Sequence, residues 1–499
     1  MNSPSVFVRF RLRFLVVVVA IVCSTASCAA CSSAPRAANA PPTTVSPSFP
    51  ARARVDVSGL VVYQVWLNSY AYNPAIGQTS FDVFANAATH LPDIAAMGIT
   101  AIQLSPVQPF GKESTVGTPY EIKDYYAVNP GYSGISSLKR YIDRAHTLGL
   151  RVLMDCVYHS TDPQNVLVRE HPEFYLRGPG GAIRRNVFHF AMLDYAKPAL
   201  RSYMIDMTKY WALSVGFDGC RADVATAIPV SFWAMVNNEL KRVKPGWLMI
   251  AEASDQLGEY GGTYTGPGYR LAERYDHVYA FDALYGVEYM SALRRILNQN
   301  APAGLLQRAL RLPDGLRAAA PRGATLYRGV DNHDQRPRTE QLRGGNDGML
   351  AAMVVSFTIG GIPFIFNGQE IGDAAPTSVF KQTFVDWAHP QHPDNAGVFK
   401  ELISLTRANP ALVRGTTTWC DTSDESRTIG YLRRRGADRV LVVVNLSSQA
   451  WEGSVVLPPN TPPMRSVVDL RSGRVSEARG RTLRLSLPPF AALIGTVRI

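Results

Sequence analysis

Short apolar runs alternate with longer amphipathic stretches along most of the chain. Eight runs rich in apolar and β-branched residues predict strands, at 60–67, 99–105, 151–157, 216–223, 247–252, 277–284, 325–332 and 362–367. Most are separated by stretches with helical spacing of apolar positions, such as 84–97, 135–148, 198–213 and 348–358. This alternation is typical of an α/β fold with a parallel sheet, and eight repeats favour a closed (β/α)8 barrel over an open sheet.

The pattern changes in two other parts of the chain. Residues 159–197, after the third predicted strand, are long for a connection and rich in Gly, Pro and Arg, so we expect an excursion from the barrel there. From residue 413 onward the apolar runs become short and alternating, with turn residues between them. This predicts a barrel domain over 58–412 and a C-terminal all-β sandwich domain over 413–499.

The first 40 residues are typical of an export signal. Three arginines precede Phe14–Val22, an apolar run of nine residues that is too short to cross a bilayer as a helix. Cleavage is expected either after the Ala38-Asn39-Ala40 site or before Cys28, which would then carry a lipid. We therefore expect a periplasmic or extracellular protein, with membrane contact only through such an anchor, and a Pro/Ser-rich linker over 41–57.

Composition and charge narrow the class of protein. Hydrophobic residues make up 46% of the 499 residues and charged residues 18%, which excludes a mainly disordered chain. The net charge of +11 lies mostly outside the barrel: residues 1–40 carry +4, residues 413–499 carry +6, and the rest carries +1. A nearly neutral barrel argues against a nucleic-acid partner. Cys156, Cys220 and Cys420 are expected to be buried as small hydrophobic residues.

Acidic residues stand at the ends of several predicted strands. Asp155 lies near the end of the third, Asp223 ends the fourth, Glu252 ends the fifth, and His333 and Asp334 follow the seventh. In a β/α barrel, the carboxyl ends of the strands form the face on which active sites are built. We therefore expect Asp223, Glu252 and Asp334 to converge at one barrel mouth.

The neighbours of these acids predict different roles for them. Side chains alternate along a strand, so Arg221 should face the same way as Asp223 and lower its pKa, which suits a nucleophile. Glu252 follows an apolar run, where a raised pKa would suit a general acid. A retaining glycosidase needs two such carboxyl groups, and a third can orient the hydroxyl groups of the sugar.

At this point the sequence resembles the α-amylase family, glycoside hydrolase family 13, from about residue 58 to the C-terminus. The segments GFDGCRADVA, around Asp223, and VDNHD, ending at Asp334, are similar to two family motifs, and Glu252 stands in a third. Three supporting segments also resemble the family: 97–107, 118–130 and 361–372. The resemblance implies Asp223 as nucleophile, with Arg221 as its partner, and Glu252 as acid/base. It also implies that His333 and Asp334 position the substrate and that Tyr120 stacks on the sugar.

Two departures from the family pattern change the expected site. The first motif usually reads D-x-V-x-N-H, but residues 155–160 read DCVYHS. His159 replaces an asparagine that often binds calcium, and Ser160 replaces a histidine that contacts the sugar; a shift of one residue would let His159 take that second role. Thr226 and Ala227 replace a Lys-His pair that contacts the leaving-group sugar in many amylases. Calcium therefore stays an open cofactor, and no metal ligand is assigned.

These observations leave three functions open. The first is an exported retaining hydrolase that cleaves α-glucosidic bonds in starch-type glucans or maltooligosaccharides. The second is a glucanotransferase or trehalose-forming isomerase that uses the same residues. The third is a carbohydrate-binding protein without activity, which is disfavoured because all three acids are present.

Overall fold

The computed structural model describes residues 55–111, 117–253, 280–310 and 325–499. The expected leader, most of the linker and the Gly/Tyr-rich segment around Tyr260, Tyr264 and Tyr269 lie outside these ranges. Eight parallel strands form a closed barrel in the order β1-β10-β9-β8-β7-β6-β3-β2, so the predicted architecture is confirmed. The strands are β1 (Val62–Val65), β2 (Ala101–Leu104), β3 (Arg151–Cys156), β6 (Gly219–Ala222), β7 (Leu248–Ala251), β8 (Ala283–Leu284), β9 (Thr325–Arg328) and β10 (Ile362–Phe366).

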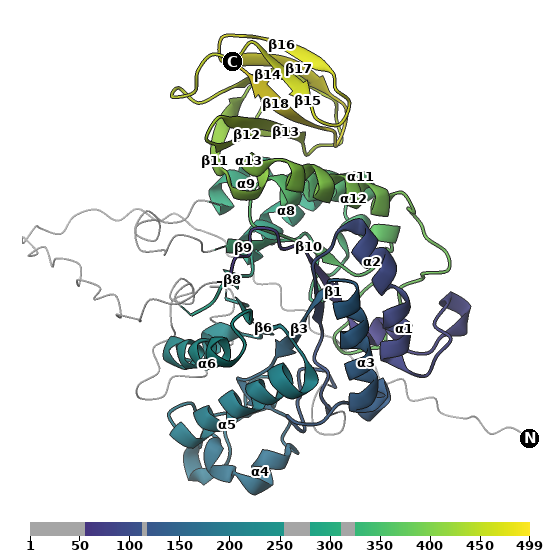
Figure 1. Ribbon diagram of the computed structural model, residues 1–499, viewed down its shortest axis with the longest axis vertical. Coiled ribbons are helices and arrows are strands. Elements are labelled where there is room, and N and C mark those ends of the chain that lie inside the picture. Colours follow the sequence, from purple (N-terminus) through teal and green to yellow (C-terminus); the bar gives the residue numbers. More distant parts are fainter. Residues whose placement is uncertain (1–54, 112–116, 254–279, 311–324) are drawn as a thin grey trace, which may run out of the picture. The chain divides into compact units, whose positions relative to one another are not determined.

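Helices follow most of the barrel strands (Figure 1). They are α1 (Val83–Thr89), α2 (Leu91–Met97), α3 (Gly134–Thr147), α5 (Pro198–Lys209), α6 (Val230–Val243), α8 (Val287–Gln299), α9 (Leu305–Ala309), α11 (Gly345–Thr358), α12 (Asn395–Ala408) and α13 (Pro410–Arg414). The single helix predicted over 84–97 is instead two helices that meet at His90, because Pro92 opens the second one. None of the helices in the described ranges is long and apolar enough to cross a membrane.

The segment after β3 leaves the barrel as predicted from its composition. It contains a small antiparallel pair, β4 (Ser160–Thr161) and β5 (Ala191–Met192), and the short helix α4 (Val166–Glu170). The chain then returns through α5, which begins at Pro198 and continues as a π-helical segment, Tyr210–Val215. That segment ends at Gly216, whose φ of 113° lies in the region that favours glycine.

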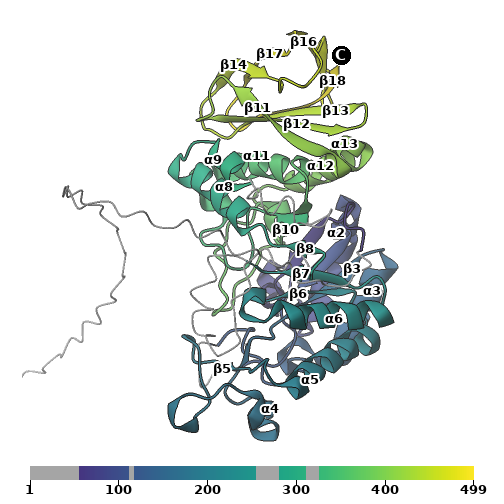
Figure 2. The ribbon, with the colours of Figure 1, turned by 90° about the vertical axis from the view of Figure 1, so that its left-hand side faces the viewer.

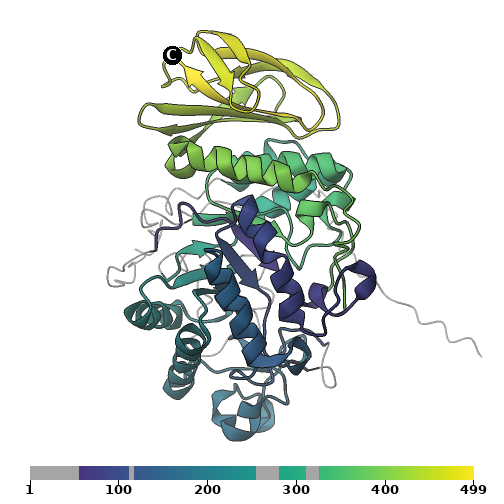
Figure 3. The ribbon, with the colours of Figure 1, turned by 45° about the vertical axis from the view of Figure 1, so that its right-hand side comes forward.

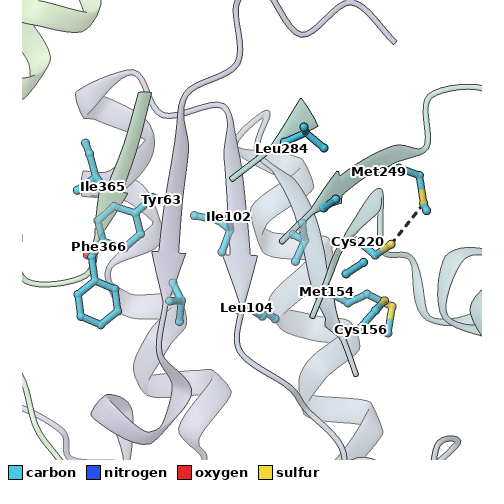
Figure 4. Packing of buried hydrophobic residues seen from close by; sticks show 14 of the residues in the cluster. Tyr63, Ile102, Leu104, Met154, Cys156, Cys220, Met249, Leu284, Ile365 and Phe366 are labelled. Atoms are coloured by element: carbon cyan, nitrogen blue, oxygen red, sulfur yellow. Dashed lines mark hydrogen bonds between the residues drawn. The ribbon is translucent and has the colours of Figure 1, made fainter. Parts of the chain in front are cut away.

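Two separate sets of apolar side chains follow from the alternation along the barrel strands. One set, with Val62, Leu153 and Leu248, fills the interior of the barrel. The other, with Tyr63, Ile102 and Cys220, faces the surrounding helices (Figure 4). Cys156 and Cys220 are free and buried in this outer layer, as predicted, and the Sγ of Cys220 lies 3.4 Å from the Sδ of Met249.

The same alternation decides which polar side chains enter the barrel. Asp155 on β3 is paired in register with Arg221 on β6, and both alternate with the outward-facing cysteines. Glu252 follows Ile250 by two residues, so it continues the inward-facing row of β7. The inward rows of β3, β6 and β7 therefore end in polar residues, which places the functional groups at the carboxyl face.

The C-terminal part is an all-β domain of eight antiparallel strands. They are β11 (Thr416–Thr422), β12 (Thr428–Arg435), β13 (Asp438–Asn445), β14 (Trp451–Val456), β15 (Ser466–Asp469), β16 (Val475–Arg479), β17 (Thr482–Leu487) and β18 (Ala492–Arg498). Their order, β11-β12-β13-β18-β15-β16-β17-β14, closes on itself, so each strand of the expected sandwich has two neighbours. A core of its own, including Leu441, Trp451 and Leu483, lies between them.

Helices α11 and α13 connect this domain to the barrel (Figures 2 and 3). Arg433 on β12 is buried, and its guanidinium donates to the carbonyl groups of Ile359, after α11, and Leu412, in α13, at 2.8 and 2.9 Å. It also donates to the hydroxyl of Thr417. Burial lowers the pKa of Arg433 to about 10, so the group stays charged at neutral pH. One arginine therefore satisfies helix-end carbonyls that no backbone donor satisfies.

We expect Arg433→Met to destabilise the protein by about 1–3 kcal/mol, because it leaves the buried carbonyl of Leu412 without a donor and removes one of the two donors to the carbonyl of Ile359, the other being the hydroxyl of Thr417. Urea-induced unfolding followed by tryptophan fluorescence measures this difference. Arg434→Met is the matched control, because Arg434 is the next residue on β12 and is exposed. Equal stability of the two variants would contradict the role given to Arg433.

Candidate active site

One guanidinium group contacts three carboxylates at the end of the barrel strands. Nη1 of Arg221 lies 2.7 Å from Oδ1 of Asp155 and 2.7 Å from Oδ1 of Asp223. Nη2 of the same side chain lies 2.8 Å from Oε2 of Glu252. The Arg221 side chain has no exposed surface, and the Asp223 and Glu252 side chains are only 9% and 11% exposed. Asp223 and Glu252 therefore lie side by side on adjacent nitrogens of one buried cation.

The backbone after Asp223 also holds Glu252 in place. The N–H of Val224 donates to Oε2 of Glu252 at 2.8 Å, and Val224 adopts a left-handed conformation with φ 40°. A β-branched residue in this region is uncommon and strained. In this conformation the chain turns sharply after β6, and the backbone N–H of Val224 points at the carboxylate of Glu252.

A chain of hydrogen bonds links His333 to the carboxylates. The amide nitrogen of Gln64, which can only donate, lies 2.9 Å from Nδ1 of His333, so the neutral ring carries its proton on Nε2. That nitrogen lies 2.6 Å from the hydroxyl of Tyr120, which in turn donates to Oδ2 of Asp155 at 2.9 Å. The indole of Trp66 stacks on His333 at 5.1 Å and fixes the plane of the ring. Gln64 and Trp66 thus hold His333 in one tautomer and one orientation.

Both histidines at the site are neutral at physiological pH. Burial, together with the charge of Arg221, lowers the pKa of His159 and of His333 to about 4. Nδ1 of His159 lies 3.5 Å from Oδ2 of Asp223, and Nε2 of His333 lies 3.3 Å from Oδ2 of Asp334. A neutral imidazole can donate a hydrogen bond without adding positive charge beside the acids.

The acids experience opposing influences. Burial raises the pKa of Asp223 well above its usual value, the nearby Glu252 and Asp155 raise it further, and Arg221 lowers it. The influence expected of Arg221 from the sequence is therefore present, but burial outweighs it. Burial likewise raises the pKa of Asp155, although Arg221 and His333 lower it.

A central cavity of about 510 Å³ opens above this cluster. Its floor is polar and includes Asp223, Glu252 and His333. Its walls are largely apolar and come from four connections: the excursion after β3, the turns after β6 and β8, and the loop after β10. The apolar residues lining it are Val187, Phe188, Phe190, Val224, Tyr285, Val287, Met290, Val379 and Phe380.

The structure brings all eight predicted site residues together, but at two depths. The residues that line the central cavity are Tyr120, His159, Asp223, Glu252, His333 and Asp334. Asp155 and Arg221, predicted to contact the substrate, do not line it; they lie beneath the floor, because Tyr120 and Asp223 cover them. Asp334 stands at the rim with a side chain 45% exposed.

The sequence left open whether His159 or Ser160 faces the sugar, and the structure distinguishes the two residues. His159 lines the central cavity, whereas Ser160 is fully buried in β4 and does not line it. In the described part of the chain, no group of three or more His, Cys, Asp or Glu side chains could hold a metal ion. His159 takes the place of a calcium-ligating asparagine and faces Asp223 instead. The first motif therefore offers an imidazole and no amide oxygen at this position.

Gln64 and Trp66 are functional neighbours that the sequence pattern did not indicate. Both occur at the first predicted strand, and Trp66 is 1% exposed, as expected for a core residue. Only the closure of the barrel, which places β1 two strands from β9, brings them to His333. Gln64 had one available signal, because it is a polar residue at an inward position of a buried strand.

A (β/α)8 barrel whose strand ends carry paired carboxyl groups under a cavity is the architecture of a glycosidase. A family model described as "Alpha amylase, catalytic domain" matches residues 86–173 and 170–426. The chain belongs to the alpha-amylase family, and it is a glycosidase of that family.

Curated relatives are consistent with this assignment. A cyclomaltodextrinase from Geobacillus thermopakistaniensis is 26% identical, over 90% of this chain and 80% of the relative. A cyclomaltodextrinase from a Bacillus species is also 26% identical, over 71% of this chain and 64% of the relative. Neopullulanase 2 from Thermoactinomyces vulgaris is 24% identical, over 81% and 69%. The chain thus spans about two thirds to four fifths of the length of these relatives.

Solved structures share the fold. The crystal structure of a maltogenic alpha-amylase from Thermotoga neapolitana superimposes with a TM-score of 0.76 at 24% identity, covering 89% of this chain and 99% of the other. An alpha-amylase from Lactobacillus plantarum gives a TM-score of 0.74 over 88% of this chain. At this level of identity, the match establishes the architecture.

We expect Tyr120→Phe to lower kcat/KM roughly 10- to 100-fold while the fold stays intact, because the hydroxyl removed bridges Asp155 and His333. Steady-state kinetics on a maltooligosaccharide and thermal unfolding measure the two effects. Tyr289→Phe is the control: it removes another buried hydroxyl, bonded to Ser356 at 2.9 Å and outside the floor of the site. Similar losses in both variants would argue against the bridging role.

A buried carboxyl behind β1 provides a pH-dependent test of the scaffold. Glu370 accepts hydrogen bonds from the hydroxyl of Tyr63 and the N–H of Gly368, and burial raises its pKa from 4.5 to about 7. A raised folded-state pKa means that stability is full below pH 4.5 and falls as the pH rises through 7, because the buried group must then ionise.

Glu370→Gln should remove this dependence, because the amide mimics the protonated acid. Relative to the wild type, we expect the variant to gain about 3 kcal/mol of stability between pH 4.5 and pH 8. Denaturant unfolding across this range measures the gain, and Glu452→Gln, at an exposed position, is the control. A constant difference between Glu370→Gln and wild type would show that Glu370 is ionised in the folded state.

Proposed function

We propose that this glycosidase is a retaining hydrolase of α-glucosidic bonds in starch-type glucans, linear maltooligosaccharides and cyclomaltodextrins. The observation that supports this most directly is that Asp223 and Glu252 lie on adjacent nitrogens of Arg221 at the floor of the central cavity. A close pair of carboxyl groups suits double displacement, in which one attacks and the other transfers a proton. The names of the curated relatives, cyclomaltodextrinase and neopullulanase, support the substrate class.

In the first step, the Asp223 carboxylate attacks the anomeric carbon and the bond to the leaving oxygen breaks. Glu252 donates its proton to that oxygen, so the leaving sugar departs as a neutral alcohol. In the second step, Glu252 accepts a proton from a water molecule whose oxygen attacks the anomeric carbon and displaces Asp223. Two inversions give net retention of the α configuration.

The other residues hold the glucosyl unit during both steps. Asp334 at the rim accepts hydrogen bonds from sugar hydroxyl groups, and the neutral His159 donates to others. His333, whose N–H is held by Tyr120, fixes the position of the Tyr120 hydroxyl. Tyr120 offers its ring to the apolar face of the sugar. Arg221, from beneath the floor, keeps Asp223 and Glu252 in place and limits their mutual repulsion.

Incubation with maltoheptaose tests the reaction class. We expect shorter products that appear as α anomers, and a loss of roughly 10⁴-fold or more in Asp223→Asn. Asp421→Asn, at an exposed position in the C-terminal domain, should retain full activity. Products longer than the substrate would establish the alternative, a glucanotransferase. Binding without turnover of any α-glucoside would overturn the hydrolase proposal.

Azide rescue separates the two carboxylates on an aryl α-glucoside with a good leaving group. In Glu252→Ala, the glycosyl–Asp223 intermediate still forms, so azide should attack it and give the α-glycosyl azide. In Asp223→Ala, azide should replace the nucleophile directly and give the β-glycosyl azide. The opposite pairing of variants and products would exchange the two roles.

Export remains a prediction of the sequence, because residues 1–54 lie outside the described ranges. It is supported by the charged and apolar pattern of the leader, with Cys28 as the candidate lipid attachment point.

A further inference from the structure

A second cavity, of about 250 Å³, lies beside the central cavity, between α8 and the loop that follows β9. Three arginines line it: Arg294 and Arg295 from α8, and Arg336 from the loop. Ser291, Asn298 and Gln335 add hydroxyl and amide donors, and no described acidic residue lines it. We call it the arginine cavity.

The positive charge of the arginine cavity is only partly compensated. Arg294 is paired with Asp331 at 2.5 Å and donates to the carbonyl of Pro337, so its guanidinium is fixed by the scaffold. Arg295 and Arg336 have no carboxylate within 4.0 Å among the residues that the structure describes. Residues 41–412 as a whole carry only +1, so three arginines around one cavity are a local concentration of positive charge.

The arginine cavity and the central cavity share a wall. Val287, Gln335 and Arg336 line both. The guanidinium of Arg336 lies 5.9 Å from the ring centre of Phe380, which also lines the central cavity. Arg336 follows Asp334 by two residues, so a group bound in the arginine cavity is next to a sugar held at Asp334.

We propose that the arginine cavity binds a phosphate group, carried on a glucosyl unit adjacent to the one in the central cavity. Guanidinium groups match the oxygens of a phosphate, and charge-assisted hydrogen bonds are the strong ones. The substrate class is then an α-glucan that bears phosphate monoesters, so the inference rests on the proposed function. Free inorganic phosphate is the other source of the same chemistry, and the shared wall favours the sugar-borne group.

Calorimetric titration of the full chain carrying Asp223→Asn tests this, because binding is then measured without turnover. The probes are maltotriose, a phosphorylated maltotriose and inorganic phosphate, at one fixed ionic strength. We expect the phosphorylated sugar to bind about tenfold or more tightly than maltotriose, and this gain to disappear when Arg295→Gln is added. Arg308→Gln removes the same charge from exposed Arg308 on the neighbouring helix α9, and should keep the gain.

Three outcomes would overturn the proposal. Equal affinity for the two sugars with tight binding of inorganic phosphate, lost in Arg295→Gln, would make the cavity a site for free phosphate. If Arg295→Gln and Arg308→Gln reduced the affinity for the phosphorylated sugar equally, the gain would be a long-range effect of charge. No phosphate-dependent binding at all would remove the site. If maltotriose fails to bind while the phosphorylated maltotriose binds and Arg295→Gln abolishes that binding, the proposed function fails and the arginine cavity stands.

Discussion

The site depends on one buried arginine that serves three acids. Arg221 lies within hydrogen-bonding distance of Asp155, Asp223 and Glu252, and it has no exposed surface. A buried carboxylate without a cation would be neutralised by a proton, and a buried guanidinium without acids would be still more costly. The acids therefore depend on Arg221 to be close together, and Arg221 depends on the acids to be buried. The period-two alternation along β3, β6 and β7 makes this arrangement available.

An excess of acids over cations also suits the chemistry we propose. A glycosidase develops positive charge at the anomeric carbon in the transition state, and preorganised negative charge stabilises it. A positively charged histidine would cancel this advantage. Burial and the field of Arg221 keep His159 and His333 neutral, so they contribute hydrogen-bond donors without charge. The same cation thus adds to the effect of burial in keeping the histidines neutral, and it also holds the acids together.

The sequence identified the site residues that stand at the ends of buried strands. Parallel strands buried on both faces read as continuous apolar runs, and an acid at the end of such a run, like Glu252, stands out. Two strands of the C-terminal domain lack that signal. β11 and β16 read TTTWCDT and VSEAR, mostly alternate between exposed and partly buried positions, and are defined by their partners. The choice between His159 and Ser160 could not be made from spacing alone, because it depends on how the chain leaves β3.

Contacts between segments that are distant in the sequence could not be predicted either, because they also depend on how the chain folds. Arg433 has no distinguishing pattern around it, and Gln64 is distinguished only as a polar residue in an apolar run. Their partners are 74 and 269 residues away. The arginine cavity is another case, since Arg295 and Arg336 meet only because α8 packs beside the loop after β9. No local pattern marks two arginines on a helix and one in a loop as members of one site.

The two cavities carry opposite charge, and this arrangement has a consequence for how they work together. At the floor of the central cavity three acids face one arginine, whereas in the arginine cavity three arginines face one acid that lies outside its lining. An anionic group on the substrate would be repelled by the floor and held by the arginine cavity, so it would be kept away from the anomeric carbon under attack. The charge on Arg336 is also felt at His333, where it lowers the pKa, so an anion bound beside it would partly offset that influence. An anion bound at the rim would therefore act on the floor through one loop, the loop that carries His333, Asp334 and Arg336.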